Sequence, residues 1–177
     1  MKLFTNGFPK CGNHALQKAC ELIGQPAEVN HVPFSEGLPE GTTHHIVIKR
    51  DPRDLIISAL RFQGEEVSSG MFLARFRQFK LEGTGSLIDA MAKYEGWLTA
   101  PNTLVVSLEN LRTTDETMHE MANYLGVPYL DGAWEHLPGL TRTWNDTPSD
   151  HRLVWTPEVE KQWNAEGGAE LLARWGY

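Results

Sequence analysis

Residues 2–17 read KLFTNGFPKCGNHALQ, an apolar segment followed by a loop bounded by Gly7 and Gly12 and by the start of a helix. We expect a strand over Lys2–Thr5 and a helix from about Asn13 to Gly24, where glycine and then proline end the apolar pattern. Such a loop directs backbone N–H groups and the positive end of the helix dipole toward one point. The stretch therefore predicts an anion site in an α/β fold.

The spacing of the two loop glycines is that of an ATP-type phosphate loop, but the Lys-Ser/Thr pair that should follow is replaced by Asn13-His14. That pair normally reaches the terminal phosphates and the Mg²⁺ ion. Its absence argues against ATP hydrolysis and kinase chemistry, and a P-loop nucleotide kinase or NTPase is kept as an alternative. The lysine lies inside the loop, as Lys10.

Two further apolar segments, His44–Lys49 and Thr103–Leu108, predict buried strands, and a short strand is expected near Glu28–Val32. Strands that alternate with helices and are apolar throughout indicate a parallel sheet covered on both faces. We therefore expect an α/β three-layer sandwich with a central parallel sheet, like the P-loop nucleotide hydrolases, in a single domain over residues 1–177. Ligands of such sheets bind beyond the carboxyl ends of the strands.

Several helix boundaries are predicted by capping residues. Asp51 and Pro52 suit the start of a helix directly after the second strand. Thr113 and Glu116 have the spacing of a capping box, and a last helical region is expected from Thr156, with an interruption at the glycines 167 and 168.

The formal net charge of −7 argues against general nucleic-acid binding, which needs a cationic face. Cys11 and Cys20 form no CxxC pair, so neither a disulfide framework nor a zinc site is expected. The N-terminus lacks an unbroken apolar region, and no apolar run reaches the length of roughly 18 residues typical of a membrane span. We expect a cytoplasmic protein.

The chain resembles the sulfotransferases that use 3′-phosphoadenosine 5′-phosphosulfate (PAPS). Their phosphosulfate loop has the form Tyr/Phe-Pro-Lys-Ser-Gly-Thr/Asn-Thr-Trp, and residues 8–15 read FPKCGNHA. Their second motif is an arginine at a strand end, then Asp/Asn-Pro-Arg-Asp, then a serine eight residues after that arginine. Residues 50–58 read RDPRDLIIS, which matches in sequence and spacing. The segment His31-Val32-Pro33 is similar to the His-x-Pro segment that carries the family's catalytic base.

The resemblance implies an enzyme that moves a sulfuryl group from PAPS to an acceptor hydroxyl on a carbohydrate or a small metabolite. It assigns Lys10 to the leaving phosphate and His31 to the role of general base, with no metal. It assigns PAPS binding to the following residues: Lys10, Cys11, Gly12, Asn13, His14, Arg50 and Ser58.

The chain departs from the family pattern where the family holds adenine. Ala15 replaces a tryptophan, and Leu108 replaces the tyrosine of Tyr-Glu-Asp-Leu. The C-terminal Arg-Lys-Gly is not intact, and Arg142 and Arg152 are its nearest substitutes. These departures leave a non-catalytic nucleotide-binding protein as a further alternative. The acceptor and the oligomeric state are left open by the sequence.

Two groups of side chains are candidates for acceptor binding. Trp97, Trp144 and Trp155 are of the kind that lines carbohydrate pockets. A basic cluster between residues 61 and 80 suits an anionic acceptor, although a solvated helix face is the simpler interpretation; its members are Arg61, Arg75, Arg77 and Lys80.

Overall fold

The structure is a computed structural model that describes residues 1–82, 85–140 and 149–177. The chain forms two compact units, each of which combines two stretches of sequence. The first unit comprises Met1–Arg50 and Gly96–Asp146, and the second comprises Asp51–Glu95 and Thr147–Tyr177. The chain therefore changes from one unit to the other three times, the first time directly after Arg50.

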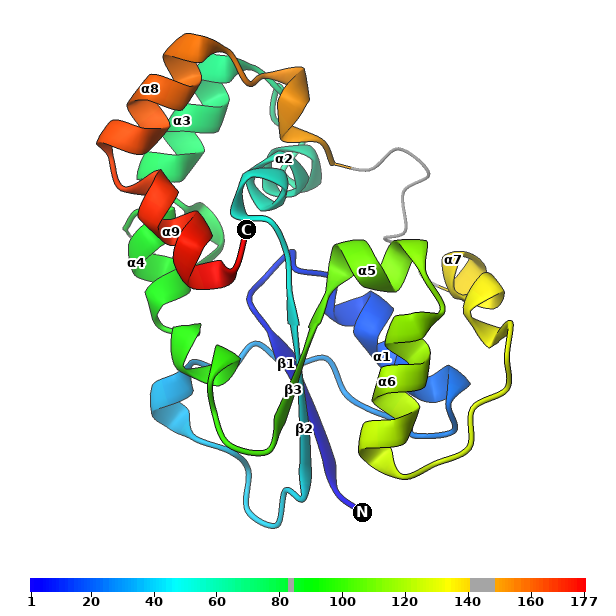
Figure 1. The fold of residues 1–177 in the computed structure, drawn as a ribbon. Helices are drawn as coiled ribbons and strands as arrows, with labels where there is room; N and C mark the ends of the chain where they lie inside the picture. Colours follow the sequence, from blue (N-terminus) through cyan, green and yellow to red (C-terminus); the bar gives the residue numbers. More distant parts are fainter. Residues whose placement is uncertain (83–84, 141–148) are drawn as a thin grey trace. The chain divides into compact units, whose positions relative to one another are not determined.

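The first unit contains a three-stranded parallel sheet of order β1-β2-β3. Figure 1 shows its helices gathered on one side of the three strands. The elements are β1 (Leu3–Gly7), α1 (Asn13–Leu22), β2 (His44–Lys49), β3 (Thr103–Ser107), α5 (Leu108–Thr113), α6 (Glu116–Leu125) and α7 (Leu137–Leu140). In the register, Gly7 lies opposite Ile48, and Lys49 lies opposite Ser107. All three strands thus end at the same edge of the sheet.

The strands and helices of the first unit share an apolar core. The central strand β2 is buried along Ile46–Ile48, as its uninterrupted apolar sequence predicts. Its second residue, His45, is also buried. The helices contribute the apolar faces that their periodicity predicts, through Leu16, Ala19, Cys20, Met118, Met121 and Leu125.

The strand predicted near Glu28–Val32 does not form. This segment instead runs beside β1 and is bound to it through side chains. Thr5 Oγ1 donates to the carbonyl of Glu28, and the amide of Asn6 exchanges hydrogen bonds with the backbone of Val32 at 2.9 Å. Side-chain bonds to the backbone take the place of a strand ladder here, which is why a strand-like sequence stays irregular.

The second unit is helical. It contains α2 (Pro52–Phe62), α3 (Ser69–Arg77), α4 (Leu87–Ala92), α8 (Pro157–Ala165) and α9 (Gly168–Trp175). Helices α3 and α8 lie side by side (Figure 1), and the ring of Trp163 packs 4.2 Å from that of Phe76. The predicted caps at Asp51 and Thr156 are confirmed, because their side chains accept from the backbone N–H groups of Arg53 and Val159.

The predicted capping box at Thr113 and Glu116 is wrong. Thr113 is the last residue of α5, and its hydroxyl lies 3.0 Å from the carbonyl of Glu109 in the preceding turn. Helix α6 begins after Asp115, without a side-chain cap. Among the described helices, none combines the length and the apolar character needed to cross a bilayer.

Acid is expected to destabilise the first unit through His45. This side chain is 1% exposed, packs against the rings of Phe4 and Trp97, and has no hydrogen-bond partner at Nε2 among the described residues. Burial lowers the pKa of His45 from 6.5 to about 4. The unfolded chain therefore binds the additional proton first, and stability falls as the pH drops from about 6.5 to about 4. The loss should reach about 3 kcal/mol.

Urea unfolding near neutral pH and near pH 4 measures this loss. A His45→Phe variant should lose much less stability in acid than the wild type. The matched control is His44→Phe, because His44 packs on Tyr124 instead. If the wild type and the His45→Phe variant lose stability equally between the two pH values, the assignment to His45 is refuted.

Candidate functional site

The loop between β1 and α1 is a tight, mostly buried turn. The N–H of Cys11 donates to the carbonyl of Phe8 at 3.1 Å, and both side chains are fully buried. Lys10 has a positive φ of 70°, which is uncommon for a residue other than glycine. The side chain of Lys10 is half-buried. The strand, loop and helix predicted from residues 2–17 are therefore present, although β1 continues to Gly7.

Both loop glycines are required by their surroundings. A Cβ on Gly7 would lie 2.6 Å from Asn13 Oδ1 and 2.8 Å from the carbonyl oxygen of Ile48. Gly12 has a φ of 102°, and a Cβ there would lie 2.6 Å from Leu108 Cδ1. Leu108, which is 6% exposed, thus supports the loop from the end of β3.

A Gly12→Ala variant should be destabilised by two separate effects. The left-handed backbone costs about 1–3 kcal/mol for an L-residue, and the contact with Leu108 adds to it. Gly24→Ala is the matched control, because Gly24 also has a positive φ, of 73°, but open space around it. Urea unfolding should show a clearly larger loss for Gly12→Ala, and equal losses would contradict the close packing of Leu108 on the loop.

Arg50 follows β2 and lies against the loop. Its Nη1 donates to the carbonyl oxygen of Lys10 at 3.1 Å. The residue is 6% exposed, and its Nε is buried without a hydrogen-bond partner in the described part of the chain. Among the described residues, no carboxylate forms an ion pair with Arg50. Because buried guanidinium groups are normally paired with an anion, the guanidinium of Arg50 is a candidate group for binding an anionic ligand.

The electrostatics of the strand ends are cationic. Burial and the nearby Arg50 lower the pKa of Lys10. Burial also lowers the pKa of Lys49 at the end of β2, and Glu109 opposes that shift. Lys10 and Arg50 repel each other, so a bound anion would stabilise the charged form of both. Lys49 and Glu109 were not predicted as site residues; Lys49 ends β2, and Glu109 stands in the first turn of α5, directly after β3.

Helix α1 begins at the loop without a side-chain cap, because its N-cap residue is Gly12. No acidic residue stands in its first turn. Its first N–H groups therefore lack the usual carboxylate or hydroxyl partner and suit an external anion. His14 is exposed at this helix start, whereas Asn13 is buried.

His31 lies next to the loop. Its Nδ1 is 2.9 Å from the carbonyl oxygen of Gly7 and 3.4 Å from Asn13 Nδ2. The residue is exposed, and the segment that carries it is bound along β1 through Asn6 and Asn30. His31 and Arg50 therefore each contact the segment between β1 and α1, His31 at Gly7 and Arg50 at Lys10.

Cys11 is a packing residue of the loop. Its side chain is fully buried, and burial raises the pKa of its thiol well above the ordinary value, with Arg50 opposing and Glu109 adding to the shift. A thiol that stays protonated is a poor nucleophile and a poor redox group.

Ser58 belongs to the second unit, where it lies half-buried on α2. The other charged residues of its motif are engaged there. Asp51 binds Arg53 through both carboxylate oxygens, and Asp54 Oδ1 lies 2.7 Å from His151 Nδ1. The contribution of Ser58 to anion binding stays a prediction.

The residues at the expected adenine positions are buried. Ala15 is 5% exposed on α1, and Leu108 packs on Gly12. Arg152 is on the surface and binds Asp150 with two nitrogens, at 2.8 Å each. Arg142 lies outside the described residues.

The basic cluster is largely neutralised by acids of its own unit. Arg75 is buried and paired with Glu65, and Arg77 is paired with Glu166. The arrangement therefore favours a structural role over the binding of an anionic acceptor.

The described candidate tryptophans belong to different units. Trp97 is buried in the first unit, and its indole N–H donates to Val32. Trp155 packs against Phe72 and Arg53 in the second unit. Trp144 lies outside the described residues.

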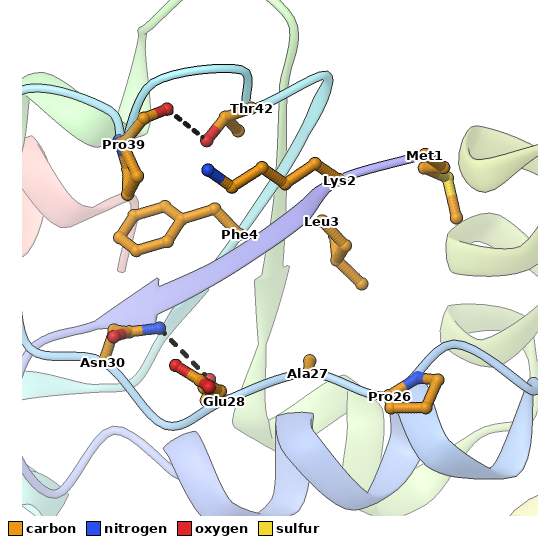
Figure 2. A pocket seen from close by; sticks show the side chains of 10 residues that line it. All are labelled: Met1, Lys2, Leu3, Phe4, Pro26, Ala27, Glu28, Asn30, Pro39 and Thr42. Atoms are coloured by element: carbon orange, nitrogen blue, oxygen red, sulfur yellow. Dashed lines mark hydrogen bonds between the residues drawn. The ribbon is translucent and has the colours of Figure 1, made fainter.

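A pocket of about 510 Å³ lies at the start of β1, away from the loop of residues 8–12 that follows the end of this strand. Figure 2 shows Phe4 of β1, and Lys2 just before this strand, between Thr42 on one side and Glu28 and Asn30 on the other. Polar groups that line this pocket are bonded to one another, as in the hydrogen bond that the Thr42 hydroxyl donates to the carbonyl of Pro39.

Two groups of described residues each bring the possible ligand atoms of two carboxylates and one histidine within 4.8 Å of one another. The members are Asp54, Asp150 and His151 in one group and Asp115, His119 and Asp131 in the other. In both groups the histidine is bound by an aspartate, and neither group includes a residue of the loop between β1 and α1.

Comparisons with known proteins show a likeness of fold. No profile of a known protein family matches the chain, and no curated protein matches it in sequence. The crystal structure of mouse sulfotransferase SULT7A1 complexed with PAP matches with a TM-score of 0.70 at 17% identity, over 93% of this chain and 81% of that chain. Retinol dehydratase in complex with androsterone and inactive cofactor PAP matches with a TM-score of 0.68 at 13% identity, over 93% and 78%.

The chain therefore has the sulfotransferase fold, with a three-stranded parallel sheet flanked by helices. The predicted α/β class and the predicted resemblance are confirmed at this level.

Proposed function

We propose that the chain is a sulfotransferase that moves the sulfuryl group of PAPS to an acceptor hydroxyl. The observation that carries this proposal is Arg50, a buried guanidinium whose Nε has no partner among the described residues and whose Nη1 is bonded to the loop at Lys10. PAPS differs from ATP in its phosphate at the ribose 3′ position, and an arginine beside a phosphate loop suits that phosphate. The two matching structures named above both contain PAP, the bisphosphate that PAPS leaves after transfer.

Lys10 and the start of α1 would hold the 5′-phosphate. During transfer, the bond between sulfur and the bridging oxygen breaks, and its electron pair stays on the leaving 5′-phosphate. The Lys10 ammonium and the N–H groups of Gly12, Asn13 and His14 offset that charge. Cys11 contributes through its place in the turn, since its own N–H is bonded to Phe8. No step in this scheme needs a metal.

Arg50 and Ser58 would hold the 3′-phosphate through charge-assisted hydrogen bonds. The assignment of Ser58 is supported by its position eight residues after Arg50. Asp51 and Arg53 of the same motif bind each other at the start of α2. We also propose that both compact units belong to one sulfotransferase domain, because the structural matches extend over 93% of the chain.

His31 would accept the proton of the acceptor hydroxyl as the new oxygen–sulfur bond forms. Histidine changes its charge near neutral pH, which suits a general base. The hydrogen bond from its ring to Gly7 supports the assignment, because it fixes the ring beside the loop.

A non-catalytic nucleotide-binding protein is the second candidate, because Ala15 and Leu108 at the expected adenine positions are buried. The Asn13-His14 pair in place of Lys-Ser/Thr argues against an NTPase. Incubation with ³⁵S-labelled PAPS and a panel of phenols, neutral sugars, acidic sugars and small alcohols separates the two. Labelled product from at least one acceptor, lost in a His31→Ala variant, supports the enzyme. Tight binding of PAPS with no labelled product from any acceptor class would contradict it.

A further inference from the structure

Asn13, Gly7 and His31 meet where β1 ends and the loop of residues 8–12 begins. Asn13 Nδ2 lies 3.0 Å from the carbonyl oxygen of Phe8 and 3.3 Å from that of Gly7. His31 Nδ1 lies 2.9 Å from the same Gly7 oxygen. The carbonyl of Gly7 is thus shared by one side chain from α1 and one from the segment beside β1.

These contacts determine which nitrogen of the neutral His31 ring carries the proton. A carbonyl oxygen can only accept, so the contact of 2.9 Å places a proton on Nδ1. Asn13 Nδ2 is itself a donor and is directed at two carbonyl oxygens that lie closer to it than the ring nitrogen does. A neutral ring protonated on Nδ1 carries its lone pair on Nε2, the atom that would accept a proton.

The amide of Asn13 is held in one orientation. Asn13 is 6% exposed, and its Oδ1 packs against Gly7, where a Cβ would stand only 2.6 Å away. The opposite orientation of the amide would set its oxygen against the carbonyl oxygens of Gly7 and Phe8, which repel it. The buried Oδ1 has no hydrogen-bond partner in the described part of the chain. The hydrogen bonds that Nδ2 donates therefore determine the orientation of this amide.

We infer that Asn13 is a positioning residue, which fixes the Gly7 carbonyl and through it keeps His31 in the tautomer with a basic Nε2. This inference rests on the proposed function for its catalytic consequence. During transfer, the acceptor proton moves to Nε2, and the resulting imidazolium keeps its bond from Nδ1 to Gly7. The loop that binds the leaving group thereby also orients the base.

The tautomer can be measured without ligand or activity. Long-range ¹H–¹⁵N NMR of the ligand-free wild type should show His31 protonated on Nδ1 and not on Nε2. In Asn13→Ala the fraction protonated on Nδ1 should fall, and in the control Asn123→Ala, which changes an exposed asparagine on α6, it should not. A wild-type His31 protonated on Nε2 overturns the inference even if no Asn13 variant folds.

Kinetics test the consequence. Asn13→Ala should lower kcat at least about tenfold. Its affinity for adenosine 3′,5′-bisphosphate should stay within about threefold of the wild type, because the backbone N–H is kept. Asn13→Asp places a carboxylate beside the ring and should move the acidic limb of the pH–rate profile up by about one unit. An unchanged kcat in Asn13→Ala, or an unchanged limb in Asn13→Asp, overturns the inference.

The NMR and the kinetic experiments separate two kinds of failure. If the wild type neither binds the bisphosphate nor transfers sulfate, the proposed function is wrong. The NMR result on His31 still decides whether Asn13 sets the tautomer.

Discussion

Replacing Lys10 with methionine is expected to lower kcat for sulfuryl transfer by about 100- to 1,000-fold, the usual effect of removing one group that stabilises developing charge. The Lys10 ammonium is half-buried beside Arg50, inside a turn that Cys11 and Gly12 complete. It therefore acts in a partly desolvated place, where its charge is less screened than at the surface. The effect should fall on kcat more than on the affinity for PAPS, because the charge on the leaving oxygen grows only during transfer.

Lys18→Met is the matched control for this variant. Lys18 lies on the same helix that follows the loop, and it is paired on the surface with Glu21. Its replacement should leave kcat within about twofold of the wild type. Equal losses in both variants, or full turnover in Lys10→Met, would exclude Lys10 from the reaction.

Replacing Arg50 with methionine should weaken the binding of adenosine 3′,5′-bisphosphate by at least about 30-fold, or about 2 kcal/mol. The guanidinium is buried and lacks a carboxylate partner in the described part of the chain, so the loss of a phosphate contact is not compensated by solvent. Arg50→Lys keeps the charge and loses the planar fork, and we expect it to weaken binding by about tenfold. Isothermal titration calorimetry measures both values.

Stability separates binding from a structural role for Arg50. Without ligand, Arg50→Met loses one hydrogen bond to Lys10 but removes a buried, uncompensated cation. We therefore expect its free energy of unfolding to stay within about 1 kcal/mol of the wild type. Arg174→Gln, which breaks a surface pair with Glu95, is the control for the loss of an arginine. Unchanged affinity in Arg50→Met, or unfolding of the variant, would contradict the assignment.

Local signals in the sequence were sufficient for much of the fold. The uninterrupted apolar run His44–Lys49 predicts β2 with its observed bounds, and the caps at Asp51 and Thr156 act within one helical turn. The capping box at Thr113 failed because two short helices, α5 and α6, follow each other there, and Thr113 bonds back into the first. The prediction of a strand near Glu28 failed because β1 binds this segment through side chains.

The site could be predicted only in part. Lys10 and Arg50 could be predicted because Lys10 lies in the loop after β1, Arg50 directly follows β2, and parallel strands end at one edge. The bond of Arg50 to the Lys10 carbonyl and the sharing of Gly7 between Asn13 and His31 join residues far apart in sequence. No local pattern encodes such contacts. The contribution of Ser58 is a prediction carried by the motif alone.

The central claim is that the site accepts a bisphosphate nucleotide without metal, and thermal unfolding with added nucleotide tests it most directly. Adenosine 3′,5′-bisphosphate without Mg²⁺, at about 100 times its Kd, should stabilise the protein by about 2.7 kcal/mol and raise the Tm accordingly. ATP with Mg²⁺ at the same concentration should raise the Tm little. A higher Tm with ATP and Mg²⁺, together with no response to the bisphosphate, would contradict the account.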